Sequence, residues 1–201
     1  MLHDAFFGMF FATCPRGLEA ALAEELRTVG AAEIRTVPGG VAFEGNLAVC
    51  YGANLQSRIA TRVLVQLAKA PYRNEQNVYD AAFEVPWQRW FSVERSIRVD
   101  VTAIRSPLKS LEFITLRIKD AVCDRFRAER GRRPNVDTRT PEVRIAAFLD
   151  AHHVTVYLDT SGEPLYKRGY RSEQGEAPLK ENLAAGVLAL AGWDAEEPLF
   201  D

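Results

Sequence analysis

Hydrophobic and polar residues follow two different periods along the first seventy residues, and the order of these periods predicts a small α/β unit. Strands are expected where apolar residues are continuous or alternate, and helices where they recur every three or four positions. The expected order is strand, helix, strand, strand, helix, strand, at residues 8–14, 18–29, 33–37, 41–44, 47–55 and 59–68. The turn residues Pro38-Gly39-Gly40 separate the two central strands. This β-α-β-β-α-β order favours a ferredoxin-like unit.

The pattern changes after residue 71 and predicts a second α/β unit with a sheet of its own. Residues 77–91 are typical of two short helical pieces separated at Pro86. Their aromatic residues, which could stack on bases but more often form a core at this spacing, are Phe83, Trp87, Trp90 and Phe91. Strands are predicted at 96–104, 143–149 and 154–158, the last two as an antiparallel hairpin around Asp150-Ala151-His152.

A long amphipathic helix is predicted between the first and second of these strands. Its start is capped either by Ser106, which precedes a proline, or by Ser110, and Gly131 ends it. The apolar residues that recur at helical spacing are Leu111, Ile114, Ile118, Ala121, Val122 and Phe126. Arg125 projects from this apolar face, so we expect it at the edge of the face or paired with an acid.

Positive charge gathers on this helix and on the loop after it. Residues 98–144 contain twelve Lys and Arg against seven Asp and Glu, a local charge of +5 in a chain whose net charge is −2. A basic block in an otherwise neutral or acidic chain favours an anionic partner, of which phosphate backbones are the commonest. The block is equally compatible with a solvated helix face that binds nothing.

The candidate RNA-binding residues are the cations on one flank of the helix, in its loop and at the end of the same unit. They are Lys119, Arg127, Arg130, Arg132, Arg133, Lys167 and Arg171. We expect them to contribute to one positive face, with Arg117 on the opposite flank of the helix. Arg144 and Arg168 are set aside, because pairing with buried acids such as Asp120 or Asp137 would give them a structural role.

Composition indicates a globular protein of the reducing cytoplasm. Hydrophobic residues make up 47% of the chain and charged residues 26%, and no apolar run reaches the ~18 residues of a membrane span. The three cysteines are widely spaced and odd in number, which predicts incidental buried thiols rather than disulfides or a metal site. His152 and His153 lie beside Asp150, but adjacent side chains of a strand face opposite ways, so a hairpin turn is favoured over a metal site.

Motifs for catalysis are missing from the 201 residues. There is neither a G-x-G-x-x-G nor a G-x-x-x-x-G-K phosphate loop, and no Ser/His/Asp or Cys/His arrangement stands out. No catalytic residue is therefore predicted, and the chain is interpreted as a binding module. Residues 172–178 are typical of a linker, and the helix expected at 179–191 has apolar residues for which we expect little cover in this chain: Leu183, Val187, Leu188 and Leu190.

Several short stretches, in order along nearly the whole chain, resemble bacterial THUMP-containing RNA methyltransferases. They are Phe11-Ala12-Thr13-Cys14-Pro15-Arg16-Gly17-Leu18-Glu19, Gly39-Gly40-Val41 with Phe43, Ile118-Lys119-Asp120-Ala121, Arg133-Pro134-Asn135-Val136-Asp137, Arg168-Gly169-Tyr170-Arg171, Ala177-Pro178-Leu179-Lys180-Glu181-Asn182-Leu183-Ala184-Ala185 and Pro198-Leu199-Phe200-Asp201. The resemblance is strongest to the N-terminal part of the enzymes that methylate guanine N2 of 23S ribosomal RNA. Sequences of this kind also carry the label N6-adenine-specific DNA methylase.

The resemblance implies an α/β (α+β) fold with three parts: a ferredoxin-like domain at 1–70, a THUMP RNA-binding domain at 71–171, and a linker with the start of a Rossmann-like methyltransferase domain at 172–201. It implies S-adenosylmethionine as cofactor of the longer enzyme and RNA as partner, with no metal and no membrane. Asp201 resembles the first residue of the cofactor loop, so we expect no cofactor on these 201 residues alone. The alternatives are a THUMP module of a tRNA-modifying enzyme, by methyl or sulfur transfer, and a protein-interaction module that does not bind RNA.

Overall fold

The chain divides into two compact units in a computed structural model that describes residues 6–170, 178–193 and 198–199. Unit 1 comprises Met1–Val63 together with Glu163–Asp201, and unit 2 is Leu64–Gly162. Both combine helices with strands, which confirms the predicted α/β class. The domain boundaries expected at residues 70 and 171 stay a prediction.

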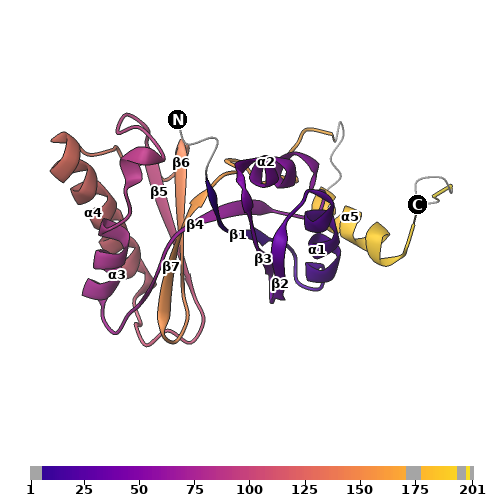
Figure 1. The fold of residues 1–201 in the computed structure, drawn as a ribbon, viewed down its shortest axis with the longest axis horizontal. Helices are drawn as coiled ribbons and strands as arrows, with labels where there is room; N and C mark the ends of the chain where they lie inside the picture. Colours follow the sequence, from indigo (N-terminus) through magenta and orange to yellow (C-terminus); the bar gives the residue numbers. More distant parts are fainter. Residues whose placement is uncertain (1–5, 171–177, 194–197, 200–201) are drawn as a thin grey trace. The chain divides into compact units, whose positions relative to one another are not determined.

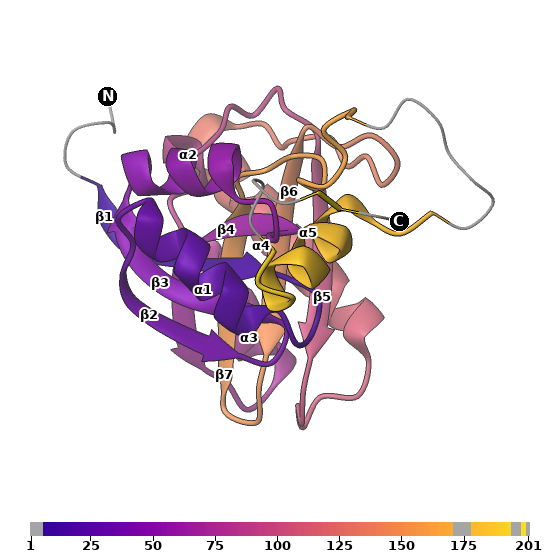
Figure 2. The ribbon, with the colours of Figure 1, turned by 90° about the vertical axis from the view of Figure 1, so that its right-hand side faces the viewer.

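Unit 1 begins with the predicted β-α-β-β-α-β order. Its elements are β1 (Phe7–Thr13), α1 (Glu19–Thr28), β2 (Ala32–Val37), β3 (Gly40–Asn46), α2 (Leu47–Gln56) and the first residues of β4 (Arg62–Pro71). Helix α1 contacts β2 and β3, α2 contacts β3, and the helices contact each other, so both cover one face of these strands (Figure 1, Figure 2). Beneath them the rings of Phe10 and Phe43 stack, with centroids 5.3 Å apart.

Glu19, the first residue of α1, joins the two turns at the ends of the unit's early strands. Its carboxylate accepts hydrogen bonds from the backbone N–H groups of Gly39 and Gly17, each at 2.8 Å. The hydrogen bond from the Gly39 N–H contributes most to holding the pKa of Glu19 below its usual value. Gly39 has a φ of +89°, a conformation that glycine adopts without steric cost. Two of the stretches that carry the family resemblance are therefore in direct contact.

Unit 2 contains the remainder of β4, followed by α3 (Glu75–Phe83), a 3₁₀ turn η1 (Trp87–Arg89), β5 (Ile97–Ala103), α4 (Leu111–Arg130), β6 (Val143–Leu149) and β7 (His153–Asp159). Strand β7 pairs antiparallel with β4 and β6, and β6 pairs parallel with β5. Helices α3 and α4 pack on each other and on this sheet (Figure 1). The predicted hairpin is confirmed, and the Asp150 carboxylate accepts the N–H groups of His152 and His153 in its turn.

Helix α4 buries the apolar face that its sequence predicts. Of the six expected residues only Leu111 is exposed, and Cys123 joins the buried set. Ser110 is the N-cap, with its hydroxyl accepting the Phe113 N–H at 3.2 Å, and Gly131 ends the helix at a φ of +68°. Arg125 pairs with Glu129 at 2.8 Å and lies over the Phe83 ring, which confirms the expectation of an acidic partner.

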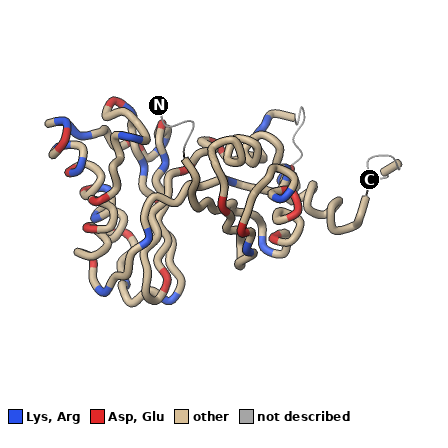
Figure 3. Tube along the Cα trace, viewed as in Figure 1, with Lys and Arg blue, Asp and Glu red and all other residues tan. Residues whose placement is uncertain are grey.

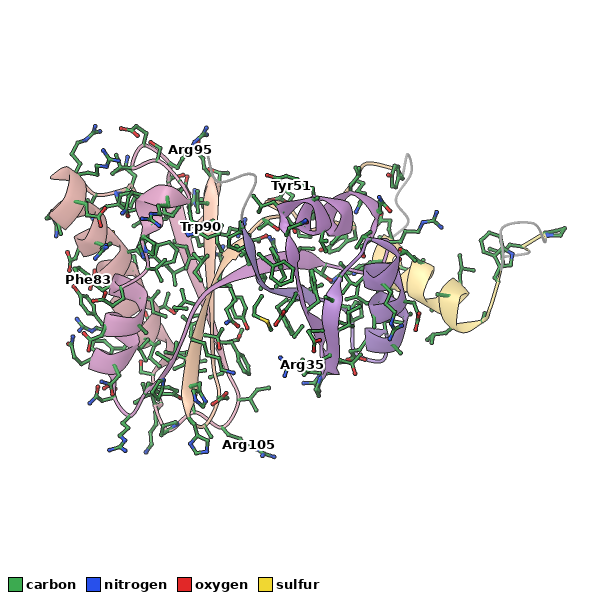
Figure 4. The ribbon with its side chains drawn as sticks, viewed as in Figure 1. Arg35, Tyr51, Phe83, Trp90, Arg95 and Arg105 are labelled. Atoms are coloured by element: carbon green, nitrogen blue, oxygen red, sulfur yellow. The ribbon has the colours of Figure 1, made fainter. Side chains whose placement is uncertain are left out.

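Of the four aromatic residues before β5, Trp87 is in the core, and Phe83, Trp90 and Phe91 are half-buried. Trp87 is fully buried and its indole N–H donates to the Ala82 carbonyl at 2.8 Å. The Phe91 ring lies 5.1 Å from that of Phe126 on α4. These contacts favour packing over base stacking for this cluster, whose Phe83 and Trp90 are labelled in Figure 4.

The prediction that each unit has its own sheet is wrong. The strands follow one hydrogen-bonded order, β2-β3-β1-β4-β7-β6-β5. Strand β4 is the reason, because its ten residues begin in unit 1 and end in unit 2, where Leu64 to Pro71 pair with β7. A hydrophobic pattern of period two predicts that a segment is a strand, but it does not show that the strand begins in one unit and ends in another.

Helix α5 (Glu181–Leu190) buries Asn182 and Gly186 within unit 1, whereas the apolar residues for which little cover was expected, Leu183, Val187, Leu188 and Leu190, are not buried. The Asn182 amide donates to the Thr61 hydroxyl at 3.0 Å and to the Ile59 carbonyl at 3.3 Å. Gly186 lies so close to Leu18 that a methyl group there would meet the leucine side chain at 2.2 Å. The opposite face is open, with Val187 and Leu190 53% and 64% exposed.

Replacing Gly40 by alanine should lower the free energy of unfolding by about 1–3 kcal/mol, as overpacking of a filled core does. The added methyl group would lie 2.5 Å from the Ala12 carbonyl oxygen, and backbone atoms of a paired strand cannot move aside. Urea denaturation measures the change. Gly52→Ala within α2 is the control, because its methyl meets only the Val29 side chain, at 3.3 Å, and alanine favours a helix by ~1 kcal/mol. Equal losses in the two variants would contradict the steric account.

Candidate nucleic-acid interface

The loop after α4, residues 131–142, is held along the first strand of unit 2's parallel pair rather than free in solution. The Ile97 N–H donates to the Asn135 carbonyl at 2.8 Å, and the Asp137 N–H donates to the Ile97 carbonyl at 3.1 Å. Pro134, which lies in the sequence between Arg133 and the anchored residue Asn135, is buried. The Asp137 carboxylate accepts the N–H groups of Thr140 and Arg139, which hold its pKa below the usual value. The loop therefore presents Arg132 and Arg133 from a fixed backbone.

Arg132 pairs with the carboxylate of Glu94. An Arg132 guanidinium nitrogen lies 3.3 Å from a Glu94 oxygen, and both side chains are exposed. The pKa of Glu94 is lowered first by the Ser92 hydroxyl and further by the charges of Arg132 and Arg130. One predicted cation is thus paired with an acid, and the charge of a second, Arg130, also acts on that acid.

Lys119 and Arg133 both act electrostatically on a second group, the Cys123 thiol. Burial raises the pKa of Cys123, whereas the Arg133 guanidinium and the Lys119 ammonium act in the opposite direction. Lys119 also forms an ion pair with its neighbour Asp120. The helix and the loop therefore each contribute one cation that acts on this thiol.

Arg127 forms an ion pair with Asp124, at 2.5 Å, one helical turn before it. Asp124 also accepts the Tyr79 hydroxyl at 3.0 Å. Along α4 basic and acidic residues alternate rather than separate, as Figure 3 shows. Exposed ion pairs contribute only ~0–1 kcal/mol, so these cations can turn from a carboxylate to a phosphate at little cost. The surface therefore presents cations whose present partners are exposed carboxylates.

Other predicted residues lie elsewhere. Lys167 is in unit 1, where it pairs with Glu163 at 3.5 Å, and Arg171 and Asp201 lie outside the described residues. A single face that joins Lys167 to the cations of unit 2 stays a prediction. Arg117, on the other flank of α4, donates to Gln76 at 2.7 Å and lies over the Tyr79 ring.

The expectation that Arg144 and Arg168 are structural residues that pair with acids is wrong for Arg168. Arg144 approaches an acid, Asp100, at 4.0 Å. Arg168 pairs with no carboxylate in the described part of the chain. Its guanidinium donates to backbone carbonyls, those of Leu165 at 2.9 Å, Asn54 at 2.9 Å, Ser57 at 2.8 Å and Leu55. Three of these carbonyls are at the C-terminal end of α2, where a cation also interacts favourably with the helix dipole.

The acidic residues that form ion pairs with these cations were not identified from the sequence. Asp124 could have been found, because its spacing of three residues from Arg127 on a helix brings the two side chains together. Glu94 could not, because it is 38 residues from Arg132 and lies in an irregular segment. In the described part of the chain, no three His, Cys, Asp or Glu side chains are placed to hold a metal ion, and no helix there has the length and apolar character to span a membrane.

Comparisons with known proteins divide the chain into three matched segments. Residues 9–64 match the RlmL ferredoxin-like domain, residues 72–159 match the THUMP domain, and residues 168–201 match an RMKL-like methyltransferase domain. The chain is 43% identical over 192 residues to the ribosomal RNA large subunit methyltransferase K/L of Aeromonas salmonicida, and the match covers 96% of the chain and 27% of the relative. The family resemblance predicted from the sequence is confirmed.

Solved structures of the same fold lead to the same group of proteins. A predicted N6-adenine-specific DNA methylase from Listeria monocytogenes superposes with a TM-score of 0.84 at 28% identity, over 96% of this chain and 50% of that one. A methyltransferase complexed with SAH, SMU.472, superposes with a TM-score of 0.82 at 28% identity, over 96% of this chain and 51% of that one. The chain thus spans about a quarter of its curated relative and half of these solved chains.

Replacing Arg168 by alanine should lower the free energy of unfolding by at least the ~1.5–3 kcal/mol that one hydrogen bond to a charged group contributes. Arg168→Lys should recover little of the loss, because an ammonium cannot reproduce the planar fork that reaches several carbonyls. Thermal and urea denaturation measure both. The adjacent Lys167→Ala is the matched control and should change stability by less than ~1 kcal/mol, since its ion pair is exposed. If Lys167→Ala lowers the free energy of unfolding as much as Arg168→Ala does, the bonds from Arg168 to the carbonyls at the end of α2 are not the cause of the loss.

Proposed function

We propose that this chain, which carries the THUMP and RlmL-type ferredoxin-like domains, is the RNA-docking part of an S-adenosylmethionine-dependent methyltransferase of 23S ribosomal RNA. The observation that carries the proposal is the 43% identity, over 96% of the chain, to proteins named for methylation of large-subunit ribosomal RNA. The exposed cations of α4 and its loop supply a surface of the right charge. The protein would act in the cytoplasm, where ribosomal RNA is modified.

The alternative of a tRNA-modifying enzyme is less well supported. A 4-thiouridine synthetase–RNA complex shares the fold with a TM-score of 0.54, but at 12% identity the likeness extends to the fold alone. The match of residues 168–201 to a methyltransferase domain favours methyl transfer over sulfur transfer. The third alternative, a protein-interaction module, leaves the ordered match to RNA methyltransferase domains without an explanation.

In the proposed complex Lys119, Arg127, Arg130, Arg132 and Arg133 contact phosphate oxygens. Phosphate contacts fix position and orientation on an RNA and carry no sequence information. The isolated chain should therefore distinguish only weakly between RNA sequences, and the target base would be chosen by the part of the longer protein that performs the chemistry. Lys167 and Arg171 are kept as members of the same proposed set.

Changing Arg132 and Arg133 together to alanine should weaken binding to a ribosomal RNA hairpin and lower the slope of log affinity against log salt concentration by roughly one for each phosphate contact removed. The reason is that each neutralised phosphate releases condensed counterions on binding. Fluorescence anisotropy at several salt concentrations measures both quantities.

The matched control for this variant removes the same two charges from unit 1, by Arg27→Ala together with Arg35→Ala. Both arginines are exposed there, and Arg35 is labelled in Figure 4. If the Arg132/Arg133 variant keeps the affinity and salt slope of the unchanged chain while its fold is intact, these arginines do not contact RNA. If the control loses as much, the effect is one of net charge only.

The cofactor is proposed to bind outside these residues. The match to the methyltransferase domain covers only 168–201, and Asp201 would be the first residue of an incomplete cofactor loop. Isothermal titration of the 201-residue chain with S-adenosylmethionine should give no heat of binding. A longer chain that includes the rest of the matched domain serves as the positive control. Micromolar binding to the 201 residues would contradict this placement.

A further inference from the structure

Unit 1 contains an open pocket that is separate from the cations of α4 and its loop. Its volume is about 800 Å³, within the ~300–1,000 Å³ that is usual for small-ligand sites. The ends of α1 and α2, the segment 165–170 and the first turns of α5 form its walls. All of its lining residues belong to unit 1.

Two of the charged lining residues hold the pocket's walls in place. Glu25 accepts the Ser57 hydroxyl at 2.6 Å and the Arg58 N–H at 3.1 Å. Arg168 ties the segment 165–170 to the end of α2 through the carbonyls described above. Because these side chains are engaged with the Ser57 hydroxyl and with backbone groups, they fix the shape of the pocket.

The remaining lining residues are Glu181, Thr28, Ser57, three aliphatic residues and four residues with aromatic, guanidinium or amide groups: Tyr166, Tyr170, Arg58 and Gln56. The Tyr170 ring is 81% exposed, and Tyr166 has the ammonium of Lys180 5.4 Å from its ring centre. Arg58 is exposed at the rim, since only its backbone N–H is bound to Glu25. Aromatic faces, a guanidinium and an amide together suit an aromatic ring that carries hydrogen-bonding edges and a nearby negative charge.

We propose that this pocket binds an unpaired nucleotide of the RNA, with the base against the rings of Tyr166 and Tyr170, its edge near Gln56 and its phosphate near Arg58. Aromatic side chains bind splayed bases of single-stranded RNA by stacking, which every base permits. The proposal rests on the proposed RNA-docking function and extends it, because the cations of unit 2 explain binding to a phosphate backbone but offer no site for a base.

The test uses a five-nucleotide single-stranded RNA with 2-aminopurine at its centre, titrated with the 201-residue chain. Stacking on tyrosine quenches the 2-aminopurine fluorescence, so quenching is expected with the unchanged chain. Tyr170→Ala should remove the quenching and weaken binding about five- to a hundredfold, the range that alanine substitution of a stacking residue gives. Arg58→Ala should weaken binding and leave the quenching at saturation in place.

Tyr51→Ala is the matched control, because Tyr51 is an exposed tyrosine of α2, 56% exposed and labelled in Figure 4, that does not line the pocket. Circular dichroism establishes that each variant is folded.

If Tyr170→Ala and Arg58→Ala bind the pentanucleotide as the unchanged chain does, the pocket is not a nucleotide site, even where Arg132 and Arg133 prove necessary for hairpin binding. Loss of pentanucleotide binding when the chain is extended through the rest of the methyltransferase domain would assign the pocket to an intramolecular contact and overturn the proposal. Failure of the hairpin experiment as well would remove the proposed function with it.

Discussion

The need to pair buried backbone groups of residues 57–61 organises unit 1. This short segment runs from α2 to β4, and Ser57, Ile59 and Ala60 are almost fully buried in it. Side chains from three distant places satisfy its polar groups: Glu25 accepts N–H groups, while Arg168 and Asn182 donate to carbonyls. Unpaired, each such group would cost ~1–3 kcal/mol. The segment therefore connects α1, the stretch 165–170 and α5, which explains why residues beyond 162 belong to unit 1.

Local sequence patterns were sufficient to predict the order of elements and the buried face of α4. Caps such as Ser110 and Asn46, the Gly131 terminator and the apolar period of α4 all depend on residues within one or two turns of each other. The shared sheet could not be predicted, because it depends on the length of one strand and on its partners some ninety residues away. The same holds for Arg168, since its carbonyl partners in α2 are more than a hundred residues earlier in the chain.

For the candidate interface, the sequence predicted which residues are basic and exposed but not how strongly acids moderate them. Glu94 lies outside the block of residues 98–144 and pairs with Arg132, so the surface is weaker in electrostatic terms than the local charge of +5 suggests. Such moderation favours reversible binding over tight, indiscriminate attachment to any polyanion. The pocket of unit 1 gave no sequence signal, because its walls come from segments more than a hundred residues apart.

The division of the chain also bears on the order in which the protein is made. Unit 2 is an insertion into unit 1, and its first and last strands pair with each other, Leu64 opposite Asp159. Residues 64–162 form a compact unit by their own contacts, so most of unit 2 can fold on the ribosome as soon as that stretch has emerged. Unit 1 completes its structure later, because the side chains that donate to the carbonyls of residues 57–61 are present only after Arg168 and Asn182 have been synthesised. The segment 57–61 is thus among the last to reach its final structure, although it is synthesised before unit 2, and a ribosome that stalled after unit 2 would leave its backbone groups exposed to chaperones and proteases.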